Sequence, residues 1–204
     1  MGILEFWNTV HAGQLTEHLG DTSRSDYVDF LSNVGDFRSH LASANTVLDY
    51  GPGKANFLMS IPSSVRRFAI DISPVARQRL IVHGIEAYPP GGGSEEMLEG
   101  QIDLATCISV VQHCTEPTVR FILQDIANAL RIGGHLYMNG IVEIRETTDD
   151  IESKMRHGRS GHTLANVIAA ARIFGLDHIG SAEYVVPKYP DDLRTWLLHL
   201  MRVE

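Results

Sequence analysis

The sequence predicts an α/β protein built around a mostly parallel β-sheet, and two patterns lead to this prediction. Apolar runs of strand length alternate along the chain with stretches whose apolar residues recur at helical spacing, which is typical of βα units. The first apolar run is also followed directly by the glycine-rich turn Gly51-Pro52-Gly53. The 204 residues are enough for a single domain that buries its own core without disulfides or metals.

Seven segments have the apolar character of strands. The most apolar of them, residues 102–111, is short and rich in β-branched residues, as expected for a central strand buried on both faces. The strands are expected over residues 46–50, 67–71, 85–88, 102–111, 135–142, 178–186 and 195–203.

At least four helices are expected to connect these strands. Ser73 is a suitable N-cap and Pro74 suits the first helical position, so a helix is expected to start there and to end near Gly84. Thr115 and Pro117 start the next one, whose apolar residues follow a helical period. The helices are expected near residues 55–60, 74–82, 115–130 and 163–175, with a polar loop over 143–162.

Composition and charge exclude several classes of function. The formal net charge of −8 and the lack of a basic run argue against nucleic acid as the main partner. No apolar run approaches the roughly 20 residues of a membrane span, and the N-terminus lacks the basic region of a secretory signal. Cys107 and Cys114 do not form a C-x-x-C pair and are expected to be buried thiols of a cytoplasmic protein. No histidine pair at i, i+4 spacing has a third ligand nearby, so no metal is expected.

The segment Val47-Leu48-Asp49-Tyr50-Gly51-Pro52-Gly53 resembles the first motif of class I S-adenosylmethionine-dependent methyltransferases. Asp71, 22 residues after Asp49, stands where that family places the acid at the end of its second strand. Residues 101–113 resemble the fourth-strand motif and residues 129–136 the segment that leads into strand five. The resemblance covers residues 46–142 and implies a three-layer Rossmann-like fold with seven strands, the last one antiparallel.

The resemblance also implies a binding site for S-adenosylmethionine. Gly51 and Gly53 would contact the methionine part of the cofactor, because glycine lets the backbone come close to a ligand, and Asp49 would help to bind its amino group. Asp71 offers a carboxylate that can accept two ribose hydroxyl groups; its alternative role is a charge at a helix N-terminus. Ser109 and Val111 would line the cofactor mainly through their backbone.

Three residues are candidates for contact with the methyl acceptor. His113 follows strand four at the ligand-binding edge of the sheet, where it could accept a proton or only hydrogen-bond the backbone. Glu143 and His162 bracket the polar loop after strand five, a region in which the family builds its acceptor pocket; the competing interpretation of the loop is surface charge.

The sequence departs from the family pattern in two places. Ala55 replaces a third glycine of the first motif, and no acid directly follows Tyr88 to bind the adenine amino group. Glu95 and Glu96 are the nearest acids, and they are also readily explained as solvated surface charges.

Together these observations predict a methyltransferase that acts on a small molecule, with a hydroxyl acceptor favoured by His113. The alternatives are a non-catalytic cofactor-binding or interaction module and, less favoured, a nicotinamide-dependent oxidoreductase, because Asn56 occupies the last position of G-x-G-x-x-G. One domain over 1–204 is expected, as a monomer or homodimer. Residues 1–45 would form a helical cap or lid, residues 46–142 the cofactor-binding core, and residues 143–204 the substrate side.

Overall fold

The computed structural model describes residues 3–12, 24–141, 162–186 and 193–204. Its described strands form one seven-stranded sheet in the order β3-β2-β1-β4-β5-β7-β6. The strands are β1 (Thr46–Tyr50), β2 (Arg66–Ile70), β3 (Glu86–Tyr88), β4 (Ile102–Cys107), β5 (Leu130–Ile141), β6 (Leu176–Val186) and β7 (Leu193–Arg202). β1 to β5 pair in parallel, whereas β7 is antiparallel to both β5 and β6. The predicted sheet, with its antiparallel last strand, is confirmed.

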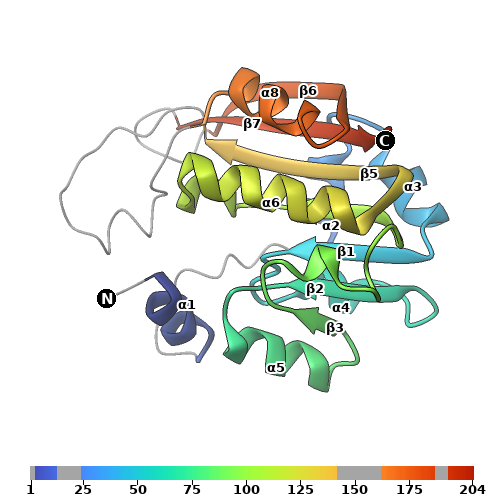
Figure 1. The fold of residues 1–204 in the computed structure, drawn as a ribbon, viewed down its shortest axis with the longest axis vertical. Helices are drawn as coiled ribbons and strands as arrows, with labels where there is room; N and C mark the ends of the chain where they lie inside the picture. Colours follow the sequence, from blue (N-terminus) through green and yellow to red (C-terminus); the bar gives the residue numbers. More distant parts are fainter. Residues whose placement is uncertain (1–2, 13–23, 142–161, 187–192) are drawn as a thin grey trace.

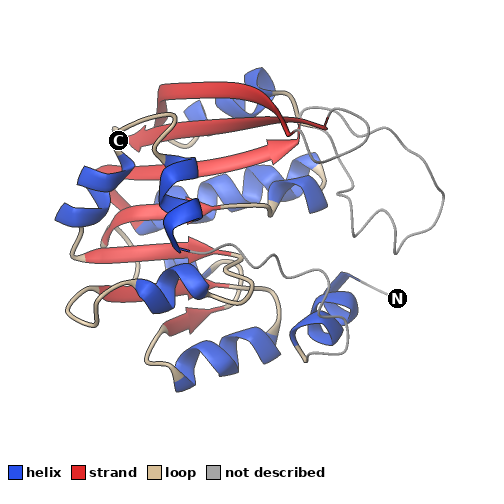
Figure 2. Cartoon of the chain, turned by 180° about the vertical axis from the view of Figure 1, so that it is seen from behind, coloured by secondary structure: helices blue, strands red, loops and turns tan. Residues whose placement is uncertain are grey.

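Helices cover both faces of the sheet and make it the middle of three layers (Figures 1 and 2). α6 and α8 pack on one face, and α2, α3 and α4 on the other, each over its own apolar cluster. The helices are α1 (Ile3–His11), α2 (Arg24–Leu31), α3 (Phe37–Ser43), α4 (Asn56–Ser60), α5 (Pro74–Val82), α6 (Glu116–Ala129) and α8 (Leu164–Arg172), with the 3-10 turns η2 (Gly92–Ser94) and η3 (Val111–His113). Among the described helices, none is both long and apolar enough to cross a bilayer.

Three predicted boundaries around the central strands were wrong. β4 ends at Cys107 rather than at residue 111, because Ser109 adopts a left-handed φ of 59° and turns the chain into η3. The Ser109 N–H donates to the Asn139 side chain at 2.7 Å and fixes this turn. The predicted helix over 115–130 ends at Ala129, and β5 begins at Leu130, five residues before the predicted start at residue 135.

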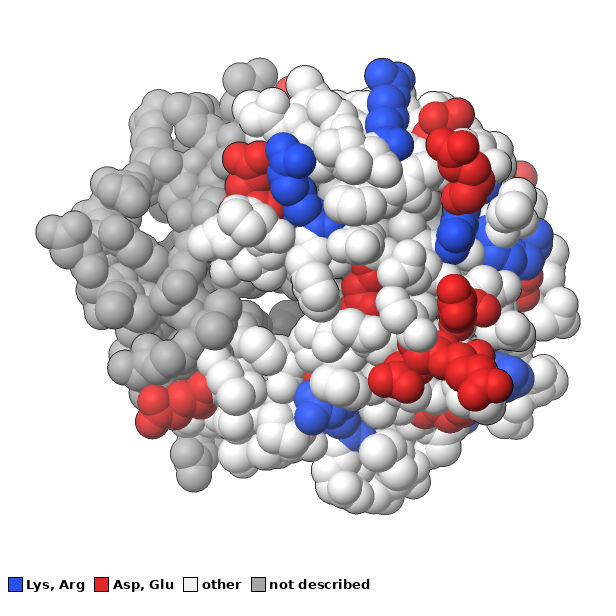
Figure 3. All heavy atoms as spheres, in the orientation of Figure 1, with Lys and Arg blue, Asp and Glu red and all other residues white. Residues whose placement is uncertain are grey.

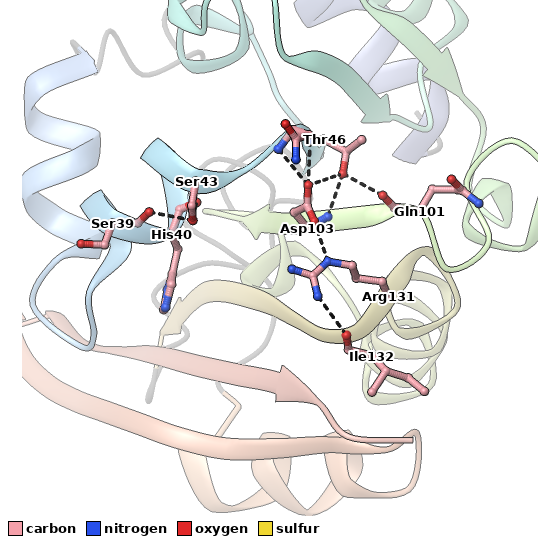
Figure 4. Close-up of polar contacts among 9 residues, drawn as sticks. Ser39, His40, Ser43, Thr46, Gln101, Asp103, Arg131 and Ile132 are labelled. Atoms are coloured by element: carbon pink, nitrogen blue, oxygen red, sulfur yellow. Dashed lines mark hydrogen bonds and ion pairs between the residues drawn. The ribbon is translucent and has the colours of Figure 1, made fainter.

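Asp103 joins three segments at the edge of the sheet opposite the carboxyl ends of the parallel strands. Its Oδ2 accepts hydrogen bonds from the backbone N–H groups of Asn45 (2.8 Å) and Thr46 (3.0 Å), and Arg131 donates to Oδ1 at 2.5 Å (Figure 4). Partial burial opposes ionisation, but the hydrogen bonds from Arg131, Asn45 and Thr46 prevail and lower the pKa of the Asp103 carboxyl. One carboxylate therefore links the start of β1 to β4 and β5.

Replacing Asp103 with alanine is expected to destabilise the protein by about 2 kcal/mol, because charge-assisted hydrogen bonds lose their acceptor. A carboxyl whose pKa is lowered by folding stabilises the protein above its unfolded pKa, and this stabilisation is lost as pH falls through the folded value. Urea denaturation from pH 7 down to pH 3 should show the difference between wild type and Asp103→Ala shrinking with acidification. The control is Asp177→Ala, an exposed acid on β6; an equal effect there would contradict the assignment.

Candidate functional site

A pocket of about 220 Å³ opens at the carboxyl ends of β1, β2 and β4. This is the edge at which open α/β sheets bind ligands. The predicted site residues Gly51, Gly53, Asp71, Ser109 and His113 line it. α1 closes one side of the pocket with Trp7 and His11, and α6 contributes Phe121.

The glycine-rich turn shapes the floor of the pocket. Gly51 has a φ of 71°, and its N–H donates to the carbonyl of Ile70 at 2.8 Å, which holds the turn against the end of β2. A Cβ on Gly51 would lie 2.5 Å from Cγ2 of Val110. Gly53 also has positive φ, at 57°, and Ala55, which stands where the family pattern has a third glycine, adopts the left-handed conformation at 60°. Alanine in that conformation costs about 1 kcal/mol, so the backbone of this turn is held by its surroundings.

Asp71 presents a buried carboxylate at the end of β2. The side chain is 5% exposed, Oδ1 accepts the Ser73 N–H at 2.8 Å, and Oδ2 lies 3.9 Å from Nε2 of His11. Burial raises the pKa of Asp71 to about 6, although the Ser73 N–H and the charges of Arg77 and Arg79 oppose the shift. Ser73 itself caps α5 by accepting the Ala76 N–H. The local role of Asp71 at the start of α5 and its position in the pocket are therefore compatible.

Asp49 and Val111 were expected to contact the cofactor, but neither lines the pocket. Asp49 is buried at the end of β1, where Thr106 donates to its Oδ1 at 2.8 Å. Val111 is the first residue of η3, and its side chain is fully buried in the core. Both residues therefore belong to the buried packing of the fold and not to the lining of the pocket.

His113 lies in η3, and its ring meets the Trp7 ring edge to face, with the centroids 5.4 Å apart. α1 is anchored nearby, because the Ser73 hydroxyl donates to the Asn8 side chain at 2.7 Å. Burial, followed by the charge of Arg79, lowers the pKa of His11 to about 4. The first helix thus covers the pocket with an indole and a neutral imidazole.

His162 does not line the pocket. It is buried, its Nε2 lies 3.0 Å from the carbonyl of Cys114, and its own carbonyl accepts the indole N–H of Trp196 at 2.6 Å. It connects β7 to the segment after η3, behind the pocket wall. Glu143 lies outside the described residues.

Sequence reasoning missed a carboxylate that positions the loop after β3. Asp125 of α6 accepts the N–H groups of Gly91 (2.7 Å) and Gly93 (2.6 Å) and the hydroxyl of Tyr50 (3.2 Å). Pro90 of this loop reaches the pocket. In the sequence, the only sign of this role is that Asp125 is an acidic residue next to the apolar face of the predicted helix over 115–130. Glu95 and Glu96, the two acids considered for adenine, are exposed and do not line the pocket.

No protein-family model and no curated protein sequence matches this chain. Many solved structures share its fold. The [4+2]-cyclase SpnF aligns with a TM-score of 0.67 at 13% identity, over 98% of this chain and 95% of that one. The 1,6-didemethyltoxoflavin-N1-methyltransferase of Burkholderia thailandensis, with bound S-adenosylhomocysteine, aligns with a TM-score of 0.63 at 18% identity, over 98% and 86%. The geranyl diphosphate C-methyltransferase of Streptomyces coelicolor aligns with a TM-score of 0.64 at 12% identity, over 88% and 78%. The chain therefore has the class I methyltransferase fold.

Proposed function

We propose that this protein binds S-adenosylmethionine and transfers its methyl group to a small-molecule acceptor. One observation carries the proposal: the left-handed Gly51 and Gly53 turn and the buried carboxylate of Asp71 face one pocket at the carboxyl ends of the strands. The methyltransferases that share the fold, some crystallised with S-adenosylhomocysteine, support it.

The residues present fit the cofactor. The Asp71 carboxylate would accept the two ribose hydroxyl groups, because the Ser73 N–H occupies only Oδ1, and carboxylate oxygens can accept more than one hydrogen bond. The glycine turn lets the backbone approach the methionine end closely. Ile72, Val110 and Phe121 supply apolar surface for the adenine ring. When bound, S-adenosylmethionine supplies a methyl group already activated on a sulfonium centre.

The chain's own contribution would be positioning, exclusion of water and removal of one proton. Placing the acceptor within roughly 3–3.5 Å of the methyl group accounts for much of the catalysis in such a displacement. Trp7 and His11 of α1 would cover the site as the predicted lid. His113 lies in the pocket wall, where its imidazole could accept the proton of a hydroxyl acceptor.

The His113→Gln substitution is expected to lower kcat about a hundredfold, the lower limit for loss of a general base, while the affinity for S-adenosylmethionine stays within a factor of two or three. A large loss in kcat with little change in the affinity for S-adenosylmethionine would distinguish a proton acceptor from a residue that only shapes the cofactor pocket. Equal losses in both quantities would assign His113 to cofactor binding instead.

The surface charge favours a neutral or cationic acceptor. On the face drawn in Figure 3, Lys and Arg side chains are interspersed with Asp and Glu, and the described residues form no continuous basic surface there. With the net charge of −8, this supports a small molecule rather than a nucleic acid.

The two free, buried cysteines support a cytoplasmic location, where thiols stay reduced. We propose that the protein consists of one domain and acts as a monomer or homodimer.

The proposal is tested by calorimetric titration of the protein with S-adenosylmethionine, S-adenosylhomocysteine and NADH. We expect micromolar binding of the first two and no response to NADH. Methyl transfer is then measured with labelled cofactor across phenols, sugar hydroxyls, amines and carboxylic acids. Binding of NADH without binding of either adenosyl compound would replace the proposal with an oxidoreductase.

A second candidate is a protein that binds the cofactor without transferring its methyl group. The fold neighbour described as a [4+2]-cyclase supports this possibility, because it shows that the fold also supports a different chemistry. This candidate would be favoured if the protein binds S-adenosylmethionine and a second small molecule in the pocket but transfers no methyl group to any of the acceptors.

A further inference from the structure

Three histidines from distant parts of the sequence meet on the face of the sheet covered by α3. They are His40 of α3, His135 of β5 and His199 of β7, and one ligand atom of each lies within 4.8 Å of the others. Nδ1 of His135 and Nε2 of His199 are 3.0 Å apart, and the His40 and His135 rings stack with centroids 3.7 Å apart. In Figure 4 the His40 side chain extends from α3 toward the sheet. None of the three lines the described pocket.

Among the described residues, the metal-binding side chains of this cluster are all imidazoles. Burial, His40 and Arg131 lower the pKa of His135 to about 4. Burial lowers the pKa of His199 to about 3, together with His135, His40 and His178. Burial also lowers the pKa of His40, although the charge of Asp36 opposes it. These three rings are therefore neutral near pH 7, which is the form of histidine that binds metals.

The hydrogen bonds of the cluster, between His135 and His199 and between His40 and Tyr137, leave one buried imidazole nitrogen without a partner. His199 is 2% exposed, and its Nδ1 has no hydrogen-bond partner. A buried polar atom left in this state costs about 1–3 kcal/mol, so each case requires an explanation. The nitrogen that would bind a cation here is Nε2 of His199, which faces Nδ1 of His135, so the unpartnered Nδ1 shows an incompletely satisfied cluster and is not itself the ligand atom.

The geometry suits a tetrahedral metal. Zinc binds imidazole nitrogen at roughly 2.0–2.1 Å, which places ligand nitrogens about 3.4 Å apart. The separations of 3.0 Å and at most 4.8 Å bracket this value. The Tyr137 hydroxyl lies 2.8 Å from Nδ1 of His40, the outer contact that commonly orients a metal-binding histidine. A Cβ on Gly35 would lie 2.6 Å from Nδ1 of His199, so glycine at this position lets the His199 ring pack against the backbone.

We propose that His40, His135 and His199 bind one divalent transition-metal ion, with Zn²⁺ as the expected occupant. An all-imidazole ligand set favours zinc, copper or nickel over magnesium or calcium, which prefer oxygen ligands. The ion would tie α3 to β5 and β7 and stabilise the fold. The spacing rule that predicted no metal considers ligands on one helix, whereas these ligands come from three elements.

The test uses untagged full-length protein treated with a chelator and then dialysed. Calorimetric titration with ZnCl₂ is expected to show one site per chain with a Kd of micromolar or below. Co²⁺ substitution should produce the visible absorption of a tetrahedral site. Saturating zinc should also raise the melting temperature, because a ligand that binds only the folded state stabilises it.

Two variants carry the test, His40→Gln and His135→Gln, because both side chains are only partly buried and glutamine keeps a polar group there. Each is expected to weaken zinc binding at least tenfold and to remove the rise in melting temperature. The matched control is His83→Gln, an exposed histidine at the end of α5 that should bind zinc as the wild type does. Tyr137→Phe should weaken binding about tenfold through the lost contact with His40.

Circular dichroism of each variant without metal establishes that it is folded. Zinc affinity unchanged in both folded histidine variants, or wild-type protein that binds no zinc at 100 µM, would overturn the proposal. The outcome is independent of S-adenosylmethionine binding, since the two sites share no described residue.

Discussion

Replacing Asp71 with alanine is expected to weaken binding of S-adenosylmethionine about a thousandfold, as measured by calorimetric titration. The expected loss is two hydrogen bonds from ribose hydroxyl groups to a charged acceptor, and each such bond is worth about 1.5–3 kcal/mol. Their sum is near 4 kcal/mol, and every 1.4 kcal/mol is a factor of ten. The matched control is Glu99→Ala, an exposed acid that does not line the pocket. Affinity unchanged in a folded Asp71→Ala protein would remove Asp71 from the site.

The same carboxylate is expected to cost the free protein stability. The pKa of Asp71 is raised to about 6, with burial as its largest cause, so the ionised form is disfavoured by folding. Stability therefore falls as pH rises from the unfolded pKa near 4 toward 6, and it stays lower above that range. Asp71→Asn keeps an oxygen to accept the Ser73 N–H and should be about 2 kcal/mol more stable than wild type at pH 7.5.

Denaturant titrations of Asp71→Asn and wild type at pH 4 and pH 7.5 check this expectation. The advantage of the variant should disappear at pH 4, where the wild-type carboxyl is protonated. In the wild type, cofactor affinity should rise as pH increases through 6 and then level off. A constant difference in stability at both pH values would contradict the burial of a charge at this position.

Gly93→Ala is expected to destabilise the protein by at least about 4 kcal/mol. A Cβ on Gly93 would lie 1.8 Å from the backbone carbonyl oxygen of Asp125 and 2.6 Å from its Oδ1. The carbonyl belongs to the middle of α6 and cannot move without breaking the helix, so the loop after β3 would have to leave its position. Large effects of this kind arise from overpacking and broken buried networks. Thermal melting or urea denaturation at pH 7 measures the loss.

Gly100→Ala is the matched control for the collision. Gly100 has a φ of 63°, but a Cβ there would meet nothing within 4 Å. The only cost of Gly100→Ala is then the left-handed backbone conformation, which should lower the stability by about 1 kcal/mol. Comparable losses at the two glycines would mean that the contact between Gly93 and Asp125 is not tightly packed.

The fold could be predicted from sequence because its signals are local and repeated. Strand-length apolar runs, the Ser73-Pro74 helix start and the helical period after Thr115 each depend on neighbours in the chain. The boundary errors have a different origin. Ser109 turns left-handed because the Asn139 side chain, 30 residues later, accepts its N–H, and no feature of the β-branched run before it indicates that contact.

The site could be predicted where it depends on strand ends, and not where it depends on packing between elements. Asp71 and His113 follow strands whose carboxyl ends share one edge, so sequence placed both at the pocket. Trp7 and His11 reach it only because α1 docks beside α5. The three histidines of the proposed metal site are equally distant in sequence, and local spacing does not detect them.

The position of β7 determines the order in which the sheet can be completed. This strand lies between β5 and β6, and its Trp196, Leu197, Leu198 and Leu200 are fully buried. During synthesis, β1 to β5 emerge first, and β5 then exposes an unpaired, apolar edge until residues 193–202 have left the ribosome. Such an edge is a template for pairing with other chains. We therefore expect nascent or truncated chains that end before residue 193 to aggregate or to require a chaperone.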